Sequence, residues 1–112
     1  MTNSRDRLID SAINEIHKQF ASGELSVPQL ARLCGIGETY FRRLFRNKTG
    51  VSPREYIARQ RISYAEQILK TRKISIAEVA ALCGYAEVSS FSREFTKRMG
   101  MSPLEYKKKF SV

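Results

Sequence analysis

Two short segments of this 112-residue chain carry side chains that can bind the edges of nucleic-acid bases or phosphate groups. In the first segment, Arg42, Arg43 and Arg46 lie close together. An arginine offers two donors to the O6 and N7 acceptors of guanine, and it can instead hold a phosphate group. In the second segment, Arg93 lies among serines and threonines, whose hydroxyl groups donate or accept and so discriminate less strictly between bases.

Helical periodicity separates the polar side chains of the first segment from its apolar ones. At about 100° per residue, Phe41, Leu44 and Phe45 share one side of a helix. The opposite side holds Thr39, Arg42, Arg43 and Arg46. These arginines either contact DNA or only keep the surface solvated, and their place on the free face of a helix favours contact.

The second segment has the same division. Phe91 and Phe95 face inward, and the outer side holds Ser89, Ser92, Arg93 and Thr96, with Ser90 at its border. Val88, near the helix start, either touches a thymine methyl group or packs against the protein.

The net charge of +9 is concentrated around these two segments. Residues 41–61 hold seven Arg or Lys and one Glu, a net of +6, and residues 93–109 hold six Arg or Lys and two Glu, a net of +4. One basic run is usually a solvated face, but two matched runs indicate a polyanionic partner.

The two segments belong to an internal repeat. Residues 25–35 align with residues 74–84 at an offset of 49, and after one inserted residue the offset becomes 50. Arg43 then pairs with Arg93. Two copies are too few for a solenoid, so the repeat indicates a duplicated small module.

Both copies carry the same signals for helix starts and ends. A serine followed three residues later by Glu or Gln, the capping-box pattern, occurs at Ser26, Ser52, Ser75 and Ser102. Glycines stand where helices should end, at Gly35, Gly50, Gly84 and Gly100. Each copy therefore predicts a short helix, a turn, a longer helix and the start of another helix.

These signals predict an all-α fold of about seven helices. It would contain two helix-turn-helix lobes, a duplicated homeodomain-like arrangement, joined by a long linker helix. The apolar residues Ile9, Ile13, Ile16 and Phe20 predict a first helix over about residues 5–20. We expect the first lobe at residues 1–52, the linker helix at 53–72 and the second lobe at 73–112, together forming one DNA-binding domain.

The sequence offers little for an enzyme. The only histidine is His17, and there is no Cys–His pair, zinc-ligand spacing or phosphate-binding glycine loop. We expect Cys34 and Cys83 to be core residues, and we expect no catalytic residue, metal ion or cofactor. No apolar run is long enough for a membrane span and no signal-peptide pattern is visible, which favours a cytoplasmic protein without a membrane partner.

Several stretches also have a distinctive order along the chain. They are Tyr56–Ala65, Ile76–Tyr85, Ser89–Lys97 and Gly100–Tyr106, together with the first repeat. In this order they resemble the signature of the AraC/XylS family of bacterial regulators, over about residues 5–110. Gly37 departs from the pattern, since the family often has a serine before the recognition helix.

The resemblance implies a seven-helix domain whose two recognition helices enter major-groove segments on one face of the duplex. By motif position, the residues that read bases would be Thr39, Arg42, Arg43, Val88, Ser89, Ser90 and Arg93. Phosphate or secondary contacts are expected from Arg46, Lys48, Arg54, Ser92, Thr96 and Lys97. Phosphate contacts are also plausible for Arg59, Arg98 and Lys107–Lys109, whereas Arg61 could instead be structural.

The predicted function is sequence-specific binding of double-stranded DNA and regulation of transcription initiation. Each recognition helix would read one of two adjacent major-groove segments. The alternatives are a non-specific architectural DNA-binding protein and a protein-interaction module. The resemblance further implies a bacterial, nucleoid-associated activator that contacts RNA polymerase. It also implies a monomeric DNA-binding domain, with dimerisation through a sensor domain that this chain lacks, so the chain could be complete or a C-terminal fragment.

Overall fold

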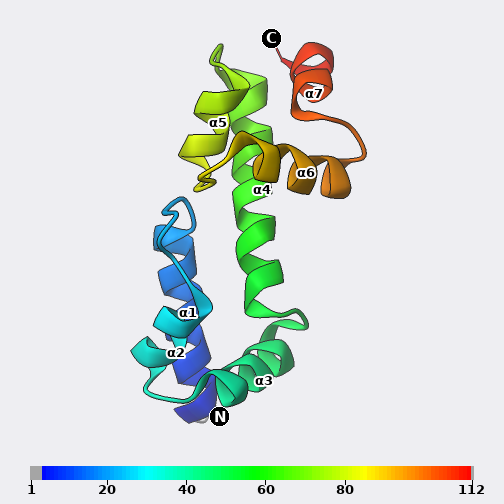
Figure 1. Ribbon diagram of the computed structural model, residues 1–112. Coiled ribbons are helices and arrows are strands. Elements are labelled where there is room, and N and C mark those ends of the chain that lie inside the picture. Colours follow the sequence, from blue (N-terminus) through cyan, green and yellow to red (C-terminus); the bar gives the residue numbers. More distant parts are fainter. Residues whose placement is uncertain (1–3, 112) are drawn as a thin grey trace. The chain divides into compact units, whose positions relative to one another are not determined.

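A computed structural model describes residues 4–111 of the protein, and in this part the chain forms seven α-helices and no strand (Figure 1). The helices are α1 Ser4–Gln19, α2 Val27–Cys34, α3 Glu38–Thr49, α4 Pro53–Thr71, α5 Ile76–Leu82, α6 Val88–Met99 and α7 Pro103–Phe110. The predicted all-α class with about seven helices is confirmed. Residues 1–3 and 112, the outer ends of the two predicted lobes, lie outside the described residues.

The helices form two compact units, and the boundary between them falls inside α4. Unit 1 comprises the chain up to Phe20 together with Glu24–Ile57, and unit 2 comprises Ala21–Gly23 and the chain from Ala58 onward. Each unit has its own cluster of buried apolar side chains. One helix-turn-helix pair therefore belongs to each unit, α2 with α3 and α5 with α6.

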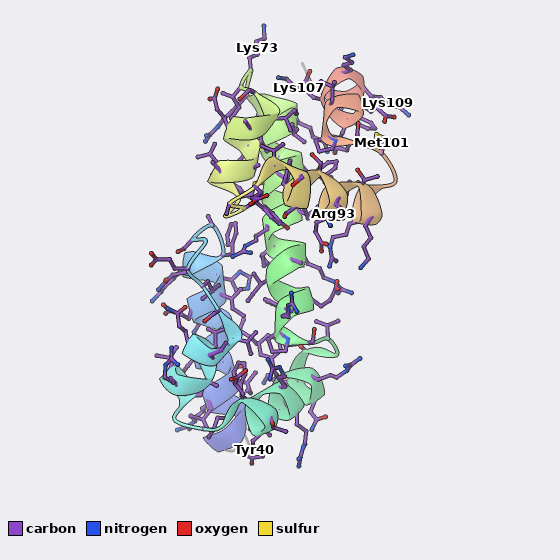
Figure 2. All side chains as sticks on the ribbon, viewed as in Figure 1. Tyr40, Lys73, Arg93, Met101, Lys107 and Lys109 are labelled. Atoms are coloured by element: carbon purple, nitrogen blue, oxygen red, sulfur yellow. The ribbon has the colours of Figure 1, made fainter. Side chains whose placement is uncertain are left out.

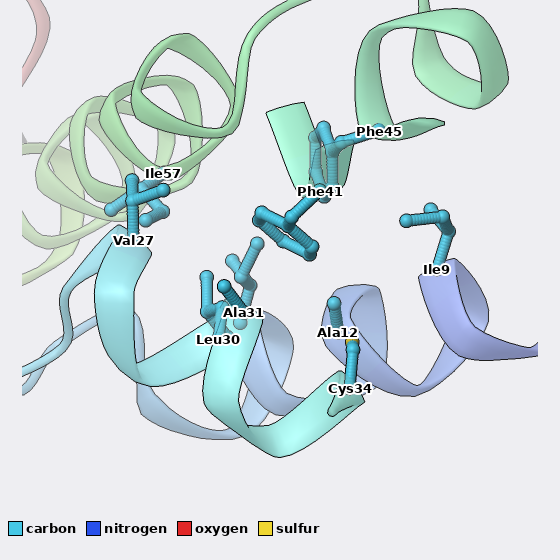
Figure 3. Close-up of a cluster of buried hydrophobic side chains, with 10 residues drawn as sticks. Ile9, Ala12, Val27, Leu30, Ala31, Cys34, Phe41, Phe45 and Ile57 are labelled. Atoms are coloured by element: carbon cyan, nitrogen blue, oxygen red, sulfur yellow. The ribbon is translucent and has the colours of Figure 1, made fainter. Parts of the chain in front are cut away.

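The core of unit 1 forms around two phenylalanines of α3. Phe41 and Phe45 are fully buried, and their ring centroids lie 5.7 Å apart. Helices α1, α2 and α3 contact one another around them. Figure 3 shows Phe41 directed toward Leu30 and Ala31 of α2, with Ile9 of α1 on the other side. The small side chain of Ala31 is buried here, as expected where two helices pack closely.

The stripe predicted on the first helix is confirmed. Ile9 and Ile16 of α1 are buried, and Ile13 and Phe20 pack partly buried against the same core. Burying an aliphatic side chain of this size stabilises the fold by about 1.5–3 kcal/mol. The pattern thus fixes which face of α1 meets α2 and α3.

Serine side chains cap the helices that the capping-box pattern predicts. At α2 the box is complete, because the backbone N–H of Gln29 donates to Ser26 Oγ and the backbone N–H of Ser26 donates to Gln29 Oε1. At the other three starts the serine hydroxyl accepts from the backbone N–H three residues later, at 3.1 Å in each case, for Ser52, Ser75 and Ser102. Such caps typically contribute about 1 kcal/mol each.

Glycines form the two tight turns inside the helix-turn-helix pairs. Gly35 ends α2 with a φ of 69°, and its N–H donates to the carbonyl groups of the last turn. In unit 2 the C-cap of α5 is Cys83, and Gly84 follows it with a φ of 91°. A side chain at such a φ costs about 1–2 kcal/mol, which explains the glycine at both turns.

Unit 2 repeats this architecture with α5, α6, α7 and most of α4. Phe91 and Phe95 of α6 are fully buried, with ring centroids 5.7 Å apart. Tyr106 of α7 packs edge-on against Phe95, and its hydroxyl donates to Glu66 Oε2 of α4 at 3.0 Å. Tyr106 therefore connects α7 with both α6 and α4.

Helix α4 is the longest element, with 19 residues, and its first turn belongs to unit 1. Its apolar stripe enters the core of unit 2 through Ile62, Ala65, Ile68 and Leu69. No helix in the described part of the chain is long and apolar enough to cross a membrane.

Candidate nucleic-acid interface

The first candidate surface is the outer face of α3. Because Phe41 and Phe45 anchor the inner face of this helix, its opposite face points away from the core. The predicted residues on that face are all exposed: Thr39, Arg42, Arg43 and Arg46. The structure therefore brings these four side chains together on one helix, as the periodicity predicts.

The limits of α3 place these side chains in its first two and a half turns. Gly37 is the N-cap, with φ −69° and ψ 155°, and it has no side chain that could cap the helix. Glu38 opens the helix, and the N–H of the left-handed C-cap Gly50 donates to Arg46 O at 2.8 Å. The departure from the family pattern at Gly37 therefore leaves α3 without a side-chain cap, and the helix still begins at Glu38.

Two arginines of α3 are held by neighbouring side chains. Arg42 Nη2 lies 3.0 Å from Glu38 Oε1 in an ion pair between residues one turn apart. Arg43 Cζ lies 6.0 Å from the ring centroid of Tyr40, within the range of a cation–π interaction. Sequence reasoning missed Glu38 and Tyr40. The spacing of Glu38 four residues before Arg42 was the signal that could have found the first pair.

The second candidate surface is the outer face of α6, where Arg93 is labelled in Figure 2. Five of the predicted residues are exposed serine, threonine or basic side chains: Ser89, Ser90, Arg93, Thr96 and Lys97. Val88, in the first turn, is 42% exposed, so its side chain remains accessible to a ligand.

Two hydroxyl-bearing residues of α6 differ from the expectation. Ser92 is only half-buried rather than exposed. Thr96 Oγ1 donates to the carbonyl of Ser92 at 2.7 Å, so its hydroxyl proton is used within the helix. Thr96 can therefore accept a hydrogen bond from a ligand more readily than it can donate one.

The flanking basic residues divide into accessible and engaged ones. Arg54, in the first turn of α4, is exposed. Lys48 is exposed and pairs with Asp10 of α1 at 3.5 Å. Arg98 Nε lies 2.6 Å from Glu94 Oε1, and Lys107 Nζ donates to the carbonyl of Ile74 at 2.6 Å. Protein groups therefore hold Arg98 and Lys107 in this structure, and phosphate contacts by these two residues stay a prediction.

The outer faces of α3 and α6 differ in chemistry at equivalent positions. An arginine and a hydroxyl group recur in both, as Arg43 with Arg93 and Thr39 with Ser89. The Glu38–Arg42 ion pair of α3 is replaced in α6 by the pair Val88 and Ser92. One scaffold thus presents a strongly charged face and a mostly uncharged one.

The chain matches a known protein family. A family model described as a helix-turn-helix domain matches residues 30–109, which run from the middle of α2 into α7 and include α3, α5 and α6. The chain belongs to the family of AraC-type helix-turn-helix domains.

Relatives of this AraC-type domain are bacterial regulators. The chain is 33% identical over 101 residues to the probable transcriptional regulator LumQ of Photobacterium leiognathi, which covers 90% of the chain and 41% of LumQ. It is 39% identical over 75 residues to the virulence regulon transcriptional activator VirF of Yersinia enterocolitica, covering 67% of the chain and 28% of VirF. The chain thus spans less than half the length of these relatives.

A solved structure has the same fold. The DNA-binding domain of the global transcriptional factor AdpA, in complex with a target DNA, superposes with a TM-score of 0.86 at 25% identity, covering 91% of each chain. The duplicated helix-turn-helix arrangement is therefore shared with a domain crystallised on DNA.

The remaining reactive side chains of this AraC-type domain have structural surroundings. His17 Nε2 lies 2.9 Å from the hydroxyl of Tyr56, whose ring packs edge-on against Phe45. Cys34 and Cys83 are buried, as expected for core residues. Burial raises the pKa of both thiols, that of Cys83 to about 12, which disfavours the reactive thiolate. Among the described residues, no group of three or more His, Cys, Asp and Glu could hold a metal ion.

Proposed function

We propose that this chain binds double-stranded DNA sequence-specifically and regulates transcription initiation, with α3 and α6 each reading base pairs in one of two adjacent major-groove segments. The observation that carries the proposal is the exposed arginine face of α3, on a recognition helix that buried Phe41 and Phe45 hold in a helix-turn-helix pair. Membership of the AraC-type family supports the same function.

The two faces would contribute differently. On α3, Arg42 and Arg43 would donate to guanine acceptors and Thr39 would contact a base edge, while Arg46, Lys48 and Arg54 would bind phosphates. On α6, Arg93 would make the strongest base contact. The other contacts there would be weaker and would come from Val88, Ser89, Ser90, Ser92, Thr96 and Lys97. We therefore expect α3 to provide the stronger guanine readout.

Further features of the whole regulator follow from its relatives. VirF is named as an activator, and activation through contact with RNA polymerase is the mode that we propose for this chain. We propose a bacterial, cytoplasmic, nucleoid-associated regulator that has no enzymatic activity. The domain itself would bind as a monomer, because two recognition helices in one chain suffice for an asymmetric site. Dimerisation would require a further sensor domain.

A selection of binding sites from random DNA tests the proposal. We expect a motif with two short subsites about 10–10.5 bp apart, which is one helical turn. Inserting about five base pairs between the subsites turns them to opposite faces of the duplex and should abolish tight binding. Equal affinity for selected and random DNA at physiological salt would instead identify a non-specific architectural protein.

A further inference from the structure

Glu38 places a carboxylate at the start of the first recognition helix, beside the arginines of α3. It is the first residue of α3, and its Oε1 lies 3.0 Å from Arg42 Nη2. The side chains of Glu38 and Arg42 are 42% and 48% exposed, so the pair is open to a ligand. In helix-turn-helix proteins the N-terminal residues of the recognition helix contact base edges.

A carboxylate in the first turn of a helix typically stabilises it by about 0.3–1 kcal/mol, but at this position the charge also has a cost for DNA binding. Exposed ion pairs between residues one turn apart contribute little to stability. On a surface that approaches DNA, a negative charge also weakens attraction to the phosphates. A role in recognising a base would offset this cost, because the carboxylate is a hydrogen-bond acceptor among donors.

The chemistry of the pair matches one base pair. In the major groove, cytosine offers only its N4 amino group as a donor, next to guanine O6 and N7, which are acceptors. Resting on the proposed function, we infer that Glu38 and Arg42 together read a C·G pair. The Glu38 carboxylate accepts from cytosine N4, and the donors of Arg42 that do not face Glu38 bind guanine.

The same pair excludes other bases at the cytosine position. Thymine presents the O4 acceptor there, which the carboxylate repels. Adenine offers an amino group but also the N7 acceptor, which favours a side chain with both a donor and an acceptor, such as glutamine. Glu38 is therefore a specificity-determining residue for cytosine.

Unit 2 provides an internal contrast. At the equivalent positions α6 has Val88, which is 42% exposed, and Ser92, so it lacks both members of the charged pair. Readout of a C·G pair by a carboxylate and an arginine should therefore occur only in the subsite bound by α3.

The experiment compares base preferences of the wild type and three variants by selection and by competition binding. We expect the wild type to prefer cytosine at one position of the α3 subsite. Glu38→Ala should reduce that preference by roughly tenfold or more. Glu38→Gln should shift it toward adenine, because glutamine binds adenine N6 and N7. All other positions, including the α6 subsite, should stay unchanged.

Glu15→Gln on α1 is the matched control for charge. It removes one negative charge from unit 1 at a residue of α1 that accepts a hydrogen bond from the Gln19 side chain. Any change in affinity that it causes should be the same for all sequences, and no base preference should change. Circular dichroism should show the same helix content in every variant.

The outcomes separate the two proposals. If the wild type selects a motif but prefers no cytosine in the α3 subsite, or if Glu38→Ala and Glu38→Gln keep every base preference, the role of Glu38 is wrong and the proposed function stands. If the wild type selects no motif at all, the proposed function itself fails.

Discussion

The guanidinium group of Arg61 lies over the ring of Tyr85, with Cζ 5.6 Å from the ring centroid, and its Nη2 donates to the carbonyl of Ser22 at 3.0 Å. All three residues belong to unit 2. Sequence alone left Arg61 between a phosphate contact and a structural role. Because its side chain is half-buried and engaged on two sides, we assign it a structural role.

Arg61→Ala should therefore lower the free energy of unfolding by about 1–3 kcal/mol, because it removes the bond to a carbonyl group and the cation–π contact. Chemical denaturation measures this change. Arg54→Ala is the matched comparison, since Arg54 is exposed in the first turn of α4. Arg54→Ala should leave stability nearly unchanged. It should reduce the slope of the logarithm of the binding constant against the logarithm of salt concentration by about 1, the loss of one phosphate contact. The reverse pattern would contradict both assignments.

The N-cap of α3 can be improved. Gly37 has the extended backbone of an N-cap, and a Cβ atom there would meet nothing within 4 Å. Gly37→Ser should raise the free energy of unfolding by about 0.5–1 kcal/mol, because serine caps the helix and restricts the unfolded chain. Gly35→Ser tests the opposite case in the same turn. Because Gly35 has a φ of 69°, a serine there should lower the free energy of unfolding by about 1–2 kcal/mol, as measured by thermal melts.

Arg43 and Arg93 occupy equivalent positions of the repeat, which allows a direct comparison of the two units. If Arg43 reads guanine, Arg43→Ala should cost about 1–3 kcal/mol of binding free energy on the selected site and relax one base position. Arg93→Ala should act likewise in the α6 subsite. Binding assays on single-base variants of the site measure both effects. An equal loss on every sequence would identify a phosphate contact instead.

The buried thiol and phenol of unit 2 should make stability fall at high pH. Burial raises the pKa of Cys83 from 9.0 to about 12 and, together with the charge of Glu94, that of Tyr85 from 10.0 to about 12. The folded chain then binds these protons more tightly than the unfolded chain does. Their contribution to stability is fully present below pH 9 and is lost as the pH rises toward 12.

Denaturation curves at several pH values between 8 and 12 measure this loss. Cys83→Ala should reduce the pH dependence above pH 9, although it also leaves a small cavity. A thiol reagent at pH 8 should modify Cys83 slowly in the native chain and rapidly in denaturant. Fast modification of the native chain would contradict the buried position of Cys83.

Much of the fold follows from local sequence signals. The capping serines, the glycines at the turns and the spacing of Phe41 with Phe45 depend on interactions within about one helical turn, so a linear pattern predicts them. The exposed face of α3 follows from the same logic, since the side that buries phenylalanines leaves the opposite side to solvent. The repeat extended these predictions to unit 2.

Tertiary structure decided which charged side chains stay available for a ligand. Arg61 and Lys107 look in the sequence like other basic residues of the two runs. The carbonyl groups and the ring that Arg61 and Lys107 bind belong to residues 24–39 positions away in the chain. Such contacts depend on how helices and loops pack, and no local pattern contains that information. The sequence by itself therefore determined the helices and their outward faces, while the packing of each unit determined which cations on them remain accessible.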